Sequence, residues 1–515
     1  MASVNISESQ AKAQASIWMR LMPSMAFALP FLALGCVAES RLFISNEHAR
    51  LLSNALIVAD RGRAELIGYV YPPLPFLFLL PWPDSIALLI ISALSAGTLA
   101  KVLWRHLRTL DVPNHARIAL LVASMAVPTS LYLATQSVIE TLALLMLVVS
   151  WDNYLAFVRQ GDTKAGFTAG FALGAALFIC QYTLIYAVIF VILTPRLISY
   201  RGSEISVALV LLFPVVVSIV AWSYISWSFT GDPVYFLRAP GSSLFVYVRP
   251  DEVELSFGWN LALRSTVRDL LMSPLYLGIG MVVAVLWPIR IAVFVAPVIL
   301  ITIVRAFGLV YPDYFAVGTY TVTALIALKP STPRKIWPFL VAVATIHLYV
   351  GYSAPLYGEM REWAQAISRG ETSAISYEEQ SVGEQLAKMP ARSVLSNDQL
   401  AYRIIARART VTPFLLPIDG LYKLAESQPS LFVSYVLAPT NPVPNIGDRV
   451  TSSYPTKSPP DFYLDSSWSE WQLYRAAVRR ESESLTIAKP ASNGQLSLHL
   501  ALQKLAMLLT WFICS

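Results

Sequence analysis

Apolar residues fill the first two thirds of the chain in runs of about 20, separated by short polar segments. A helix of about 20 residues matches the hydrocarbon thickness of a bilayer. The pattern therefore predicts a polytopic α-helical membrane protein with about 11 transmembrane helices. The predicted spans are 18–38, 84–104, 118–134, 138–157, 165–181, 183–199, 205–227, 272–288, 291–309, 314–328 and 336–352.

The pattern changes after residue 352, where helix-like and strand-like segments alternate. YEEQSVGEQLAKM predicts an amphipathic helix, and ARSVLSNDQLAYRIIARA predicts a strand followed by a helix that Asn397 or Asp398 caps. LFVSYVLA and WQLYRAA are typical of strands. We therefore expect a soluble C-terminal α/β domain. The predicted organisation is a transmembrane module at 1–352 with outer loops 39–83 and 228–271, an extracytoplasmic α/β domain at 353–480, and a tail at 481–515 with an amphipathic apolar segment.

The composition supports the membrane assignment. Of 515 residues, 56% are hydrophobic and only 14% are charged, whereas an ordinary soluble domain carries about 25% charged residues. The net charge of +6 is modest and gives no reason to expect a nucleic-acid partner. Residues 1–17 are polar and precede the first span without an obvious cleavage site, so we expect a retained first helix.

Lysine and arginine residues in short loops predict the orientation. The loop 101–117 holds four of them against one acid, Asp111, and further basic residues recur at every second loop. These loops are predicted to be cytoplasmic, together with the N-terminus. The loops 39–83 and 228–271 and the C-terminal domain are then outside, which means periplasmic if the membrane is a bacterial inner membrane. The basic residues are Lys101, Arg105, Arg108, Arg117, Arg159, Lys164, Arg196, Arg201, Arg290, Lys329, Arg334 and Lys335.

The first outer loop carries the strongest candidate for chemistry. Glu47 follows the first span closely, and charged groups near a bilayer tend to be functional. A helix starting there would place Arg50, Leu51 and Asn54 on one face. The alternative is that Glu47 is only an acid in a first helical turn, where the helix dipole favours it. His48 is a candidate to orient Glu47 or to bind the acceptor, with a surface position as the alternative.

The order of motifs resembles a known family. An acid early in the first outer loop is followed by Gly-x-x-Tyr-Pro-Pro-Leu at 68–74, VPTSLYLATQSVIETLALLML at 127–147 and FTGDPVYFLR at 229–238. Similar segments in the same order characterise the GT-C class of polyprenyl-phosphate-sugar-dependent membrane glycosyltransferases, which includes protein mannosyltransferase and aminoarabinose transferase relatives. The resemblance spans roughly residues 18–475 and lies in the order of the motifs, since no single motif is diagnostic.

The resemblance implies an enzyme that moves a sugar from a polyprenyl-phosphate donor to an extracytoplasmic glycan, lipid or protein. The family's catalytic acid falls on Glu47. Many members have an Asp-Glu pair where this chain has Asn46-Glu47, which puts a two-acid metal site in doubt, so a divalent metal remains only possible. The remaining expected site residues are Asp60, Glu140 and His48 as secondary acid or acceptor groups, Arg61, Arg63, Arg238 and Arg305 for the donor phosphate, and Tyr69, Tyr71, Pro72 and Pro73 as a wall of the site.

Each of these roles has a structural alternative. Arg61 and Arg63 can be solvated loop residues, and Asp60 can pair with either. The long side chain of Arg305 can reach the membrane–water interface and place its charged end there. The Tyr-Pro-Pro segment can be an interfacial anchor, because Pro-Pro stops a helix and tyrosine favours the interface. Two other functions also remain open: a transporter or flippase of lipid-linked sugars, which would place charges near the bilayer midplane, and a non-catalytic membrane assembly or sensor protein.

Overall fold

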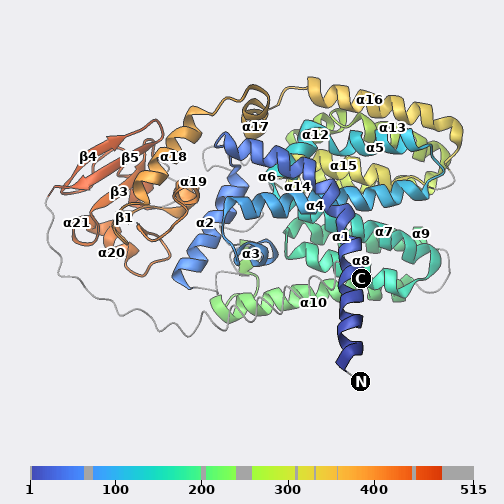
Figure 1. Ribbon diagram of the computed structural model, residues 1–515, viewed down its shortest axis with the longest axis horizontal. Helices are drawn as coiled ribbons and strands as arrows, with labels where there is room; N and C mark the ends of the chain where they lie inside the picture. Colours follow the sequence, from blue (N-terminus) through green and yellow to red (C-terminus); the bar gives the residue numbers. More distant parts are fainter. Residues whose placement is uncertain are drawn as a thin grey trace.

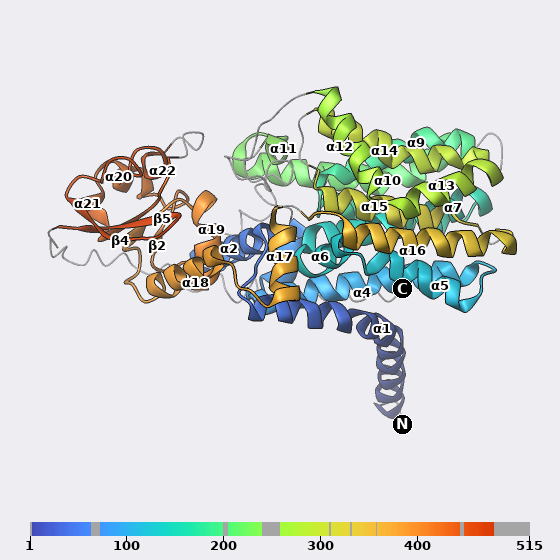
Figure 2. The same ribbon diagram turned by 90° about the horizontal axis from the view of Figure 1, so that it is seen from above.

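A computed structural model describes residues 3–62, 73–198, 204–238, 258–307, 311–329, 332–356, 358–442 and 448–477. A bundle of long helices forms one part, and a domain built on a β-sheet lies beyond one end of it, with α2 (Asn46–Arg61) between the two (Figure 1). Seen from above, α17 (Gly358–Arg369) also lies at this end of the bundle (Figure 2). The predicted tail at 481–515 lies outside the described residues.

The bundle is made of apolar helices. Each predicted span falls on one helix or on a pair of helices joined by a bend. The bundle helices are α1 (Ser3–Ser40), α4 (Ser85–Thr109), α5 (Asn114–Met125), α6 (Pro128–Gln136), α7 (Val138–Gln160), α8 (Thr163–Leu177), α9 (Leu184–Leu197), α10 (Glu204–Thr230), α13 (Pro274–Leu286), α14 (Ile291–Ala306), α15 (Asp313–Ala327) and α16 (Trp337–Ser353), with short 3-10 turns at Gln181–Thr183, Pro288–Arg290 and Arg334–Ile336.

Among the described residues, fewer helices than the 11 predicted spans are long enough to cross a membrane without a break. Within the described ranges, five helices are long and apolar enough to cross a membrane, and seven if each bent pair is one span. The pairs are α5 with α6, bent by 65°, and α12 (Trp259–Leu271) with α13, bent by 88°. Other apolar helices, such as α9 at 14 residues, are shorter than a full crossing. The chain is a multi-pass membrane protein whose apolar runs are often interrupted.

The described parts of the predicted cytoplasmic loops lie at the end of the bundle that faces away from the sheet (Figure 2). Arg105 and His106 lie 3.5 Å from the carboxylate of Asp152, in the last part of α7. Arg334, before α16, pairs with Asp111 at 3.1 Å. These contacts place basic loops that are far apart in the sequence on one side of the molecule, as the alternation of charge predicts.

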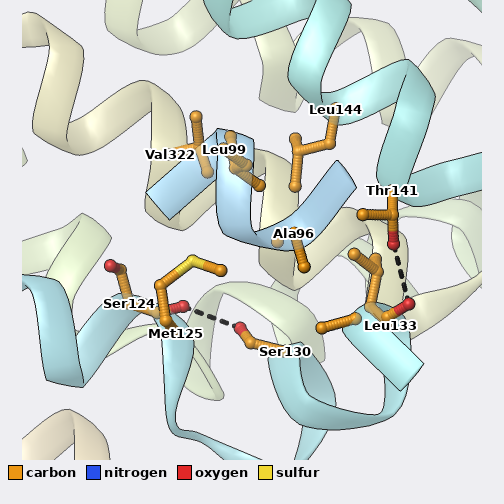
Figure 3. A pocket seen from close by; sticks show the side chains of 11 residues that line it. Ala96, Leu99, Ser124, Met125, Ser130, Leu133, Thr141, Leu144 and Val322 are labelled. Carbon is orange, nitrogen blue, oxygen red and sulfur yellow. Dashed lines mark hydrogen bonds between the residues drawn. The ribbon is translucent and has the colours of Figure 1, made fainter. Parts of the chain in front are cut away.

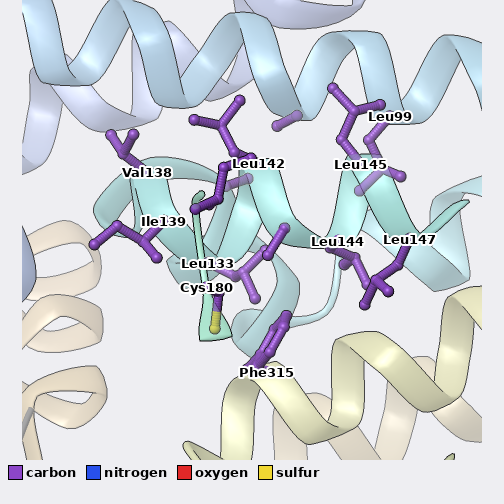
Figure 4. Close-up of a cluster of buried hydrophobic side chains, with 14 of the residues drawn as sticks. Leu99, Leu133, Val138, Ile139, Leu142, Leu144, Leu145, Leu147, Cys180 and Phe315 are labelled. Atoms are coloured by element: carbon purple, nitrogen blue, oxygen red, sulfur yellow. The ribbon is translucent and has the colours of Figure 1, made fainter. Parts of the chain in front are cut away.

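Glycines allow close helix contacts inside the bundle. A Cβ atom on Gly170 of α8 would lie 2.2 Å from the Leu211 carbonyl oxygen of α10, and one on Gly174 would lie 2.5 Å from Ser218 Oγ. The recurrence of glycine every fourth residue therefore serves packing. Around α7, the side chains of Leu142, Leu144 and others from neighbouring helices form a continuous apolar core (Figure 4).

The described parts of the predicted outer loops are largely helical. Residues 39–83 contain α2 and α3 (Pro73–Leu79), and residues 228–271 contain α11 (Tyr235–Arg238) and α12. Asp232 accepts a hydrogen bond from Val234 N (3.0 Å) and closes the turn before α11. Trp363 and Ala366 of α17 share a buried cluster with Ala38 of α1 and Tyr132 of α6, so this helix of the predicted C-terminal domain packs on the bundle.

The C-terminal domain combines a mixed sheet with helices. Its sheet has the order β2-β1-β3-β5-β4, with β1 parallel to β2 and β3, and β5 antiparallel to β3 and β4. Asn397 caps α19 by accepting a hydrogen bond from Gln399 N (2.8 Å), which settles the predicted cap. The elements are α18 (Ala374–Leu386), β1 (Val394–Leu395), α19 (Asp398–Ala408), β2 (Phe414–Leu415), α20 (Tyr422–Ser427), α21 (Pro429–Phe432), β3 (Tyr435–Pro439), α22 (Arg449–Ser452), β4 (Phe462–Ser467) and β5 (Trp471–Ala476).

Candidate active site

The candidate site lies where the N-termini of α2 and α7 meet. Ser45 caps α2 by accepting a hydrogen bond from His48 N (3.1 Å), and Ser137 caps α7 by accepting one from Glu140 N (3.3 Å). Ser45 also donates its hydroxyl to the Gln136 carbonyl oxygen at 2.6 Å, and its N–H donates to Gln136 Oε1 at 3.3 Å. The two helix starts, about 90 residues apart in the chain, are thus joined by direct hydrogen bonds.

Glu47 lies in the first turn of α2 and reaches the start of α7. Its side chain is buried, with 4% exposure, and its Oε1 accepts a hydrogen bond from Ile139 N at 2.7 Å. Its Oε2 has no hydrogen-bond partner among the described residues. The N-terminus of α7 stabilises a negative charge at this position. One carboxylate oxygen is therefore held by a backbone amide, and the other is available to accept a proton.

Glu140 is the second acid of the site. It is buried, and its carboxylate is hydrogen-bonded to the Ser137 hydroxyl. Burial raises the pKa of Glu47 well above its ordinary value, and the negative charge of Glu140 raises it further, against the opposing hydrogen bond from Ile139 N. We call Glu47 and Glu140 the acidic pair. A carboxylate with a raised pKa is a better proton acceptor in the range where hydroxyl groups are activated.

His48 is buried rather than on the surface, with 2% exposure. Burial lowers its pKa to about 3, so its ring is neutral at ordinary pH. Its Nε2 has no hydrogen-bond partner in the described part of the chain. His48 therefore does not supply a positive charge to the acidic pair.

Asn46, the residue before Glu47, enters a different network. Its N–H donates to Glu359 Oε1 of α17 at 2.7 Å, and its Oδ1 accepts a hydrogen bond from Arg403 Nη1 of α19 at 3.0 Å. Arg403 also lies 2.6 Å from Glu379 Oε1 and 3.4 Å from Glu359 Oε1. We call Asn46, Glu359, Glu379 and Arg403 the paired cluster. It fixes the start of α2 to the C-terminal domain and to α17.

The core behind the site is closely packed. A cavity lined by Ser124, Leu133, Thr141, Leu144 and neighbouring residues has a volume of about 10 Å³ (Figure 3). That is room for about one water molecule. Thr141 donates its hydroxyl to the Leu133 carbonyl oxygen at 2.7 Å within this wall. This cavity therefore offers no space for a sugar.

Asp60 and Arg61 lie at the other end of α2, about 20 Å along the helix from Glu47. They pair with each other at 2.7 Å, and Arg61 also pairs with Asp419 at 3.1 Å and donates to the Phe414 carbonyl oxygen at 2.7 Å. The predicted pairing of Asp60 with Arg61 is confirmed. The structure does not bring either side chain to the acidic pair; Arg61 connects α2 to the C-terminal domain instead.

Arg305 has the charged partners that its apolar surroundings require. It lies 2.6 Å from Asp269 of α12 and 3.0 Å from Asp313 of α15, and it donates to the Tyr311 carbonyl oxygen at 3.1 Å. Arg268 pairs with Asp313 as well. This cluster ties α12, α14 and α15 together, and the expected contact of Arg305 with the donor phosphate stays a prediction.

Several predicted site residues lie outside the described residues: Arg63, Tyr69, Tyr71 and Pro72. Pro73 is the half-buried first residue of α3, and the next residue, Leu74, donates its N–H to the Phe178 carbonyl oxygen at 3.1 Å. Arg238 is the last residue of α11, and its side chain lies outside the description. Their expected roles stay predictions.

A metal site would need more ligands than the acidic pair supplies. Among the described residues, no group of three or more His, Cys, Asp or Glu side chains is arranged to hold a metal ion. Glu47 Oε2 and Glu140 are the acids that a divalent cation would contact, with water or donor phosphate completing its shell. The expectation of a metal stays untested.

Comparisons with known proteins agree with this architecture. No protein-family model matches the chain, and no curated protein matches it. Among solved structures, ArnT from Cupriavidus metallidurans bound to undecaprenyl phosphate is similar over 90% of this chain and 99% of its own, with 12% sequence identity and a TM-score of 0.55. ArnT from the same organism in the apo state is similar over 88% and 98%, with the same identity and TM-score. At 12% identity this likeness shows the fold alone: the chain is a multi-pass membrane protein that shares the fold of ArnT over most of its length.

Proposed function

We propose that this chain is a glycosyltransferase that moves a sugar from a polyprenyl-phosphate donor to an extracytoplasmic acceptor, with Glu47 as the general base. The observation that carries the proposal is the buried Glu47 carboxylate, with one oxygen held by Ile139 N and the other without a partner in the described residues. The similar ArnT structure, which binds undecaprenyl phosphate, supports a lipid-linked donor.

The proposed reaction moves one proton and exchanges one bond. Glu47 Oε2 takes the proton of an acceptor hydroxyl while the hydroxyl oxygen attacks the anomeric carbon of the sugar. The bond from that carbon to the phosphate oxygen breaks, and polyprenyl phosphate leaves with the electron pair. Glu140 keeps the pKa of Glu47 raised, so that the base binds the proton strongly enough to remove it during attack.

The leaving phosphate needs positive charge. Arg61 and Arg305 already hold carboxylates in the described part of the chain, and drawing either to a phosphate would leave those acids unpaired. We therefore assign the donor phosphate to Arg63 and Arg238 from their places in the sequence. We also propose the orientation that the basic loops predict, with the N-terminus cytoplasmic and the C-terminal domain periplasmic in a bacterial inner membrane.

The test is transfer from a defined donor. Wild type, Glu47→Gln and the control Asp60→Asn would be purified in detergent and given polyprenyl phosphates carrying radiolabelled sugars, with membrane extract as the acceptor source. We expect Glu47→Gln to lose about 10²-fold or more of the transfer rate, while Asp60→Asn keeps it. Normal transfer by folded Glu47→Gln would contradict the assignment of the base. A wild type that consumes none of a broad donor panel would contradict the proposed activity.

A further inference from the structure

A second cavity lies apart from the acidic pair, between the bundle and the C-terminal domain. It has a volume of about 350 Å³ and is lined by the end of α1, the start of α4 and the facing side of α18 and α19. This volume is in the range of small-ligand sites. The lining residues are Cys36, Glu39, Ser40, Leu42, Ile44, Ser85, Ile86, Leu89, Gln380, Ala406, Arg407 and Arg409.

A buried cation lines this cavity. Arg407 is 7% exposed and donates one N–H to the Leu42 carbonyl oxygen. Its Nε has no hydrogen-bond partner in the described residues. A guanidinium is a strong donor to phosphate, and an unsatisfied buried donor is destabilising. Arg409, which is largely exposed, adds a second positive charge and lies 3.8 Å from Asp84.

The same cavity also contains a carboxylate. Glu39, at the end of α1, accepts a hydrogen bond from the Ser85 hydroxyl at 2.8 Å through Oε1. Both residues line the cavity together with Arg407. A site with a cation and an anion side by side is complementary to a head group that carries both a phosphate and an amine.

The rest of the lining is apolar and continues onto the surface of the bundle. Cys36, Leu42, Ile44 and Leu89 line the cavity, and Ile86 is 45% exposed. Further along the same two helices, Leu29 of α1 and Leu94 of α4 are 63% and 40% exposed. Since α1 and α4 are membrane spans, this surface faces the hydrocarbon chains of lipids.

We propose that this cavity binds the head group of a membrane phospholipid that carries an amine, as phosphatidylethanolamine does. The phosphate lies on Arg407 and Arg409, the ammonium group lies on Glu39, and the acyl chains run along α1 and α4. The lipid joins the bundle to the C-terminal domain at a place where Arg407 and Leu42 already connect them. This site is independent of the proposed transfer reaction.

Native mass spectrometry of the full-length protein in detergent tests the proposal. We expect wild type to retain one phosphatidylethanolamine more tightly than phosphatidylglycerol, which has no amine. Arg407→Gln should weaken both lipids by about tenfold, because a charge-assisted contact is lost. Glu39→Gln should remove the preference for phosphatidylethanolamine while phosphatidylglycerol still binds. Equal retention of the two lipids by wild type, or unchanged binding by Arg407→Gln, would overturn the proposal.

Two controls keep the test decisive if Arg407→Gln fails to fold. Ser40→Trp places a large side chain at the exposed rim of the cavity without changing a charge, and we expect it to reduce lipid binding in a folded protein. Unchanged binding by Ser40→Trp would count against the cavity. Water-soluble phosphoethanolamine should compete only weakly, because it lacks acyl chains; competition as strong as that of the whole lipid would rule out a membrane lipid as the source.

Discussion

Asn46 and Glu47 are neighbours in the first turn of α2, yet their side chains belong to two different polar clusters. One cluster pairs its acids with a cation, and the other consists of two acids. In the paired cluster, the guanidinium of Arg403 lies within 2.6 Å of Glu379 and 3.4 Å of Glu359. In the acidic pair, Glu47 and Glu140 lie together, and backbone and hydroxyl groups are their recorded hydrogen-bond partners within the described residues. The first arrangement sets a cation between its acids, and the second concentrates charge of one sign.

The difference separates a structural role from a chemical one. Buried acids matched by a cation hold elements together, and removing the cation leaves a charge stranded. Buried acids placed side by side destabilise the ionised state, which is tolerated where a proton must be taken up. Because both clusters meet at the start of α2, the C-terminal domain fixes the helix that presents the base. Each prediction below tests one side of this comparison.

The largest stability effect should come from the paired cluster. Replacing Arg403 with Met leaves the buried Glu379 and the half-buried Glu359 without their cation, so we expect a loss of about 3–5 kcal/mol, measured as a lower thermal unfolding midpoint in detergent. Arg409→Met is the control, at the C-cap of the same helix; its pair with Asp84 is largely exposed, and about 1 kcal/mol or less should be lost. Similar midpoints for the two variants would show that Arg403 does not hold the cluster together.

The acidic pair should make stability depend on pH. A carboxyl group whose pKa is raised by folding stabilises the fold fully below its ordinary pKa, and that stabilisation is lost as the pH rises through the raised value. The free energy of unfolding of wild type should therefore fall as the pH increases above about 4.5, by at most about 1.4 kcal/mol per pH unit for each proton released. The fall is measured as a lower unfolding midpoint. Glu47→Gln should flatten this dependence. If Glu47→Gln keeps the pH dependence of the wild-type unfolding midpoint, folding does not raise the pKa of Glu47.

The smallest effect should come from Asp60, at the far end of α2. Its pair with Arg61 is partly exposed, and such pairs contribute about 0–1 kcal/mol. We expect Asp60→Asn to change the unfolding midpoint little and to leave the transfer rate within about threefold of wild type. A loss of transfer as large as that of Glu47→Gln would move the base to Asp60 and reverse the comparison.

Local patterns predicted much of this fold. Apolar runs gave the position of every bundle helix, and the Asn397 cap and the strands at 435–439 and 471–476 follow from segments singled out in the sequence. The lengths of the helices were not predictable in the same way, because bends such as the one between α5 and α6 depend on packing. The two-residue strand β2 and the strand β4 were missed, since neither has a distinctive apolar alternation.

The site was only partly visible in the sequence. Glu47 and Glu140 were both candidates, but their contact joins residues 93 positions apart in the chain, so only the fold brings them together. The Ser137-x-x-Glu140 sequence is a capping-box pattern and was the one local signal for the start of α7. The paired cluster was missed because Glu359, Glu379 and Arg403 look like ordinary polar residues of amphipathic helices.

The most direct test of the account is the pH dependence of kcat/KM for transfer by wild type and Glu140→Gln, with Glu47→Gln as the baseline. Wild type should lose activity on the acid side as Glu47 becomes protonated, at a pH above the ordinary range of a glutamate. Glu140→Gln removes the neighbouring negative charge, so its acid limb should move to lower pH while transfer persists. Profiles that coincide for wild type and Glu140→Gln, or an acid limb that survives in Glu47→Gln, would contradict Glu47 as a base tuned by Glu140.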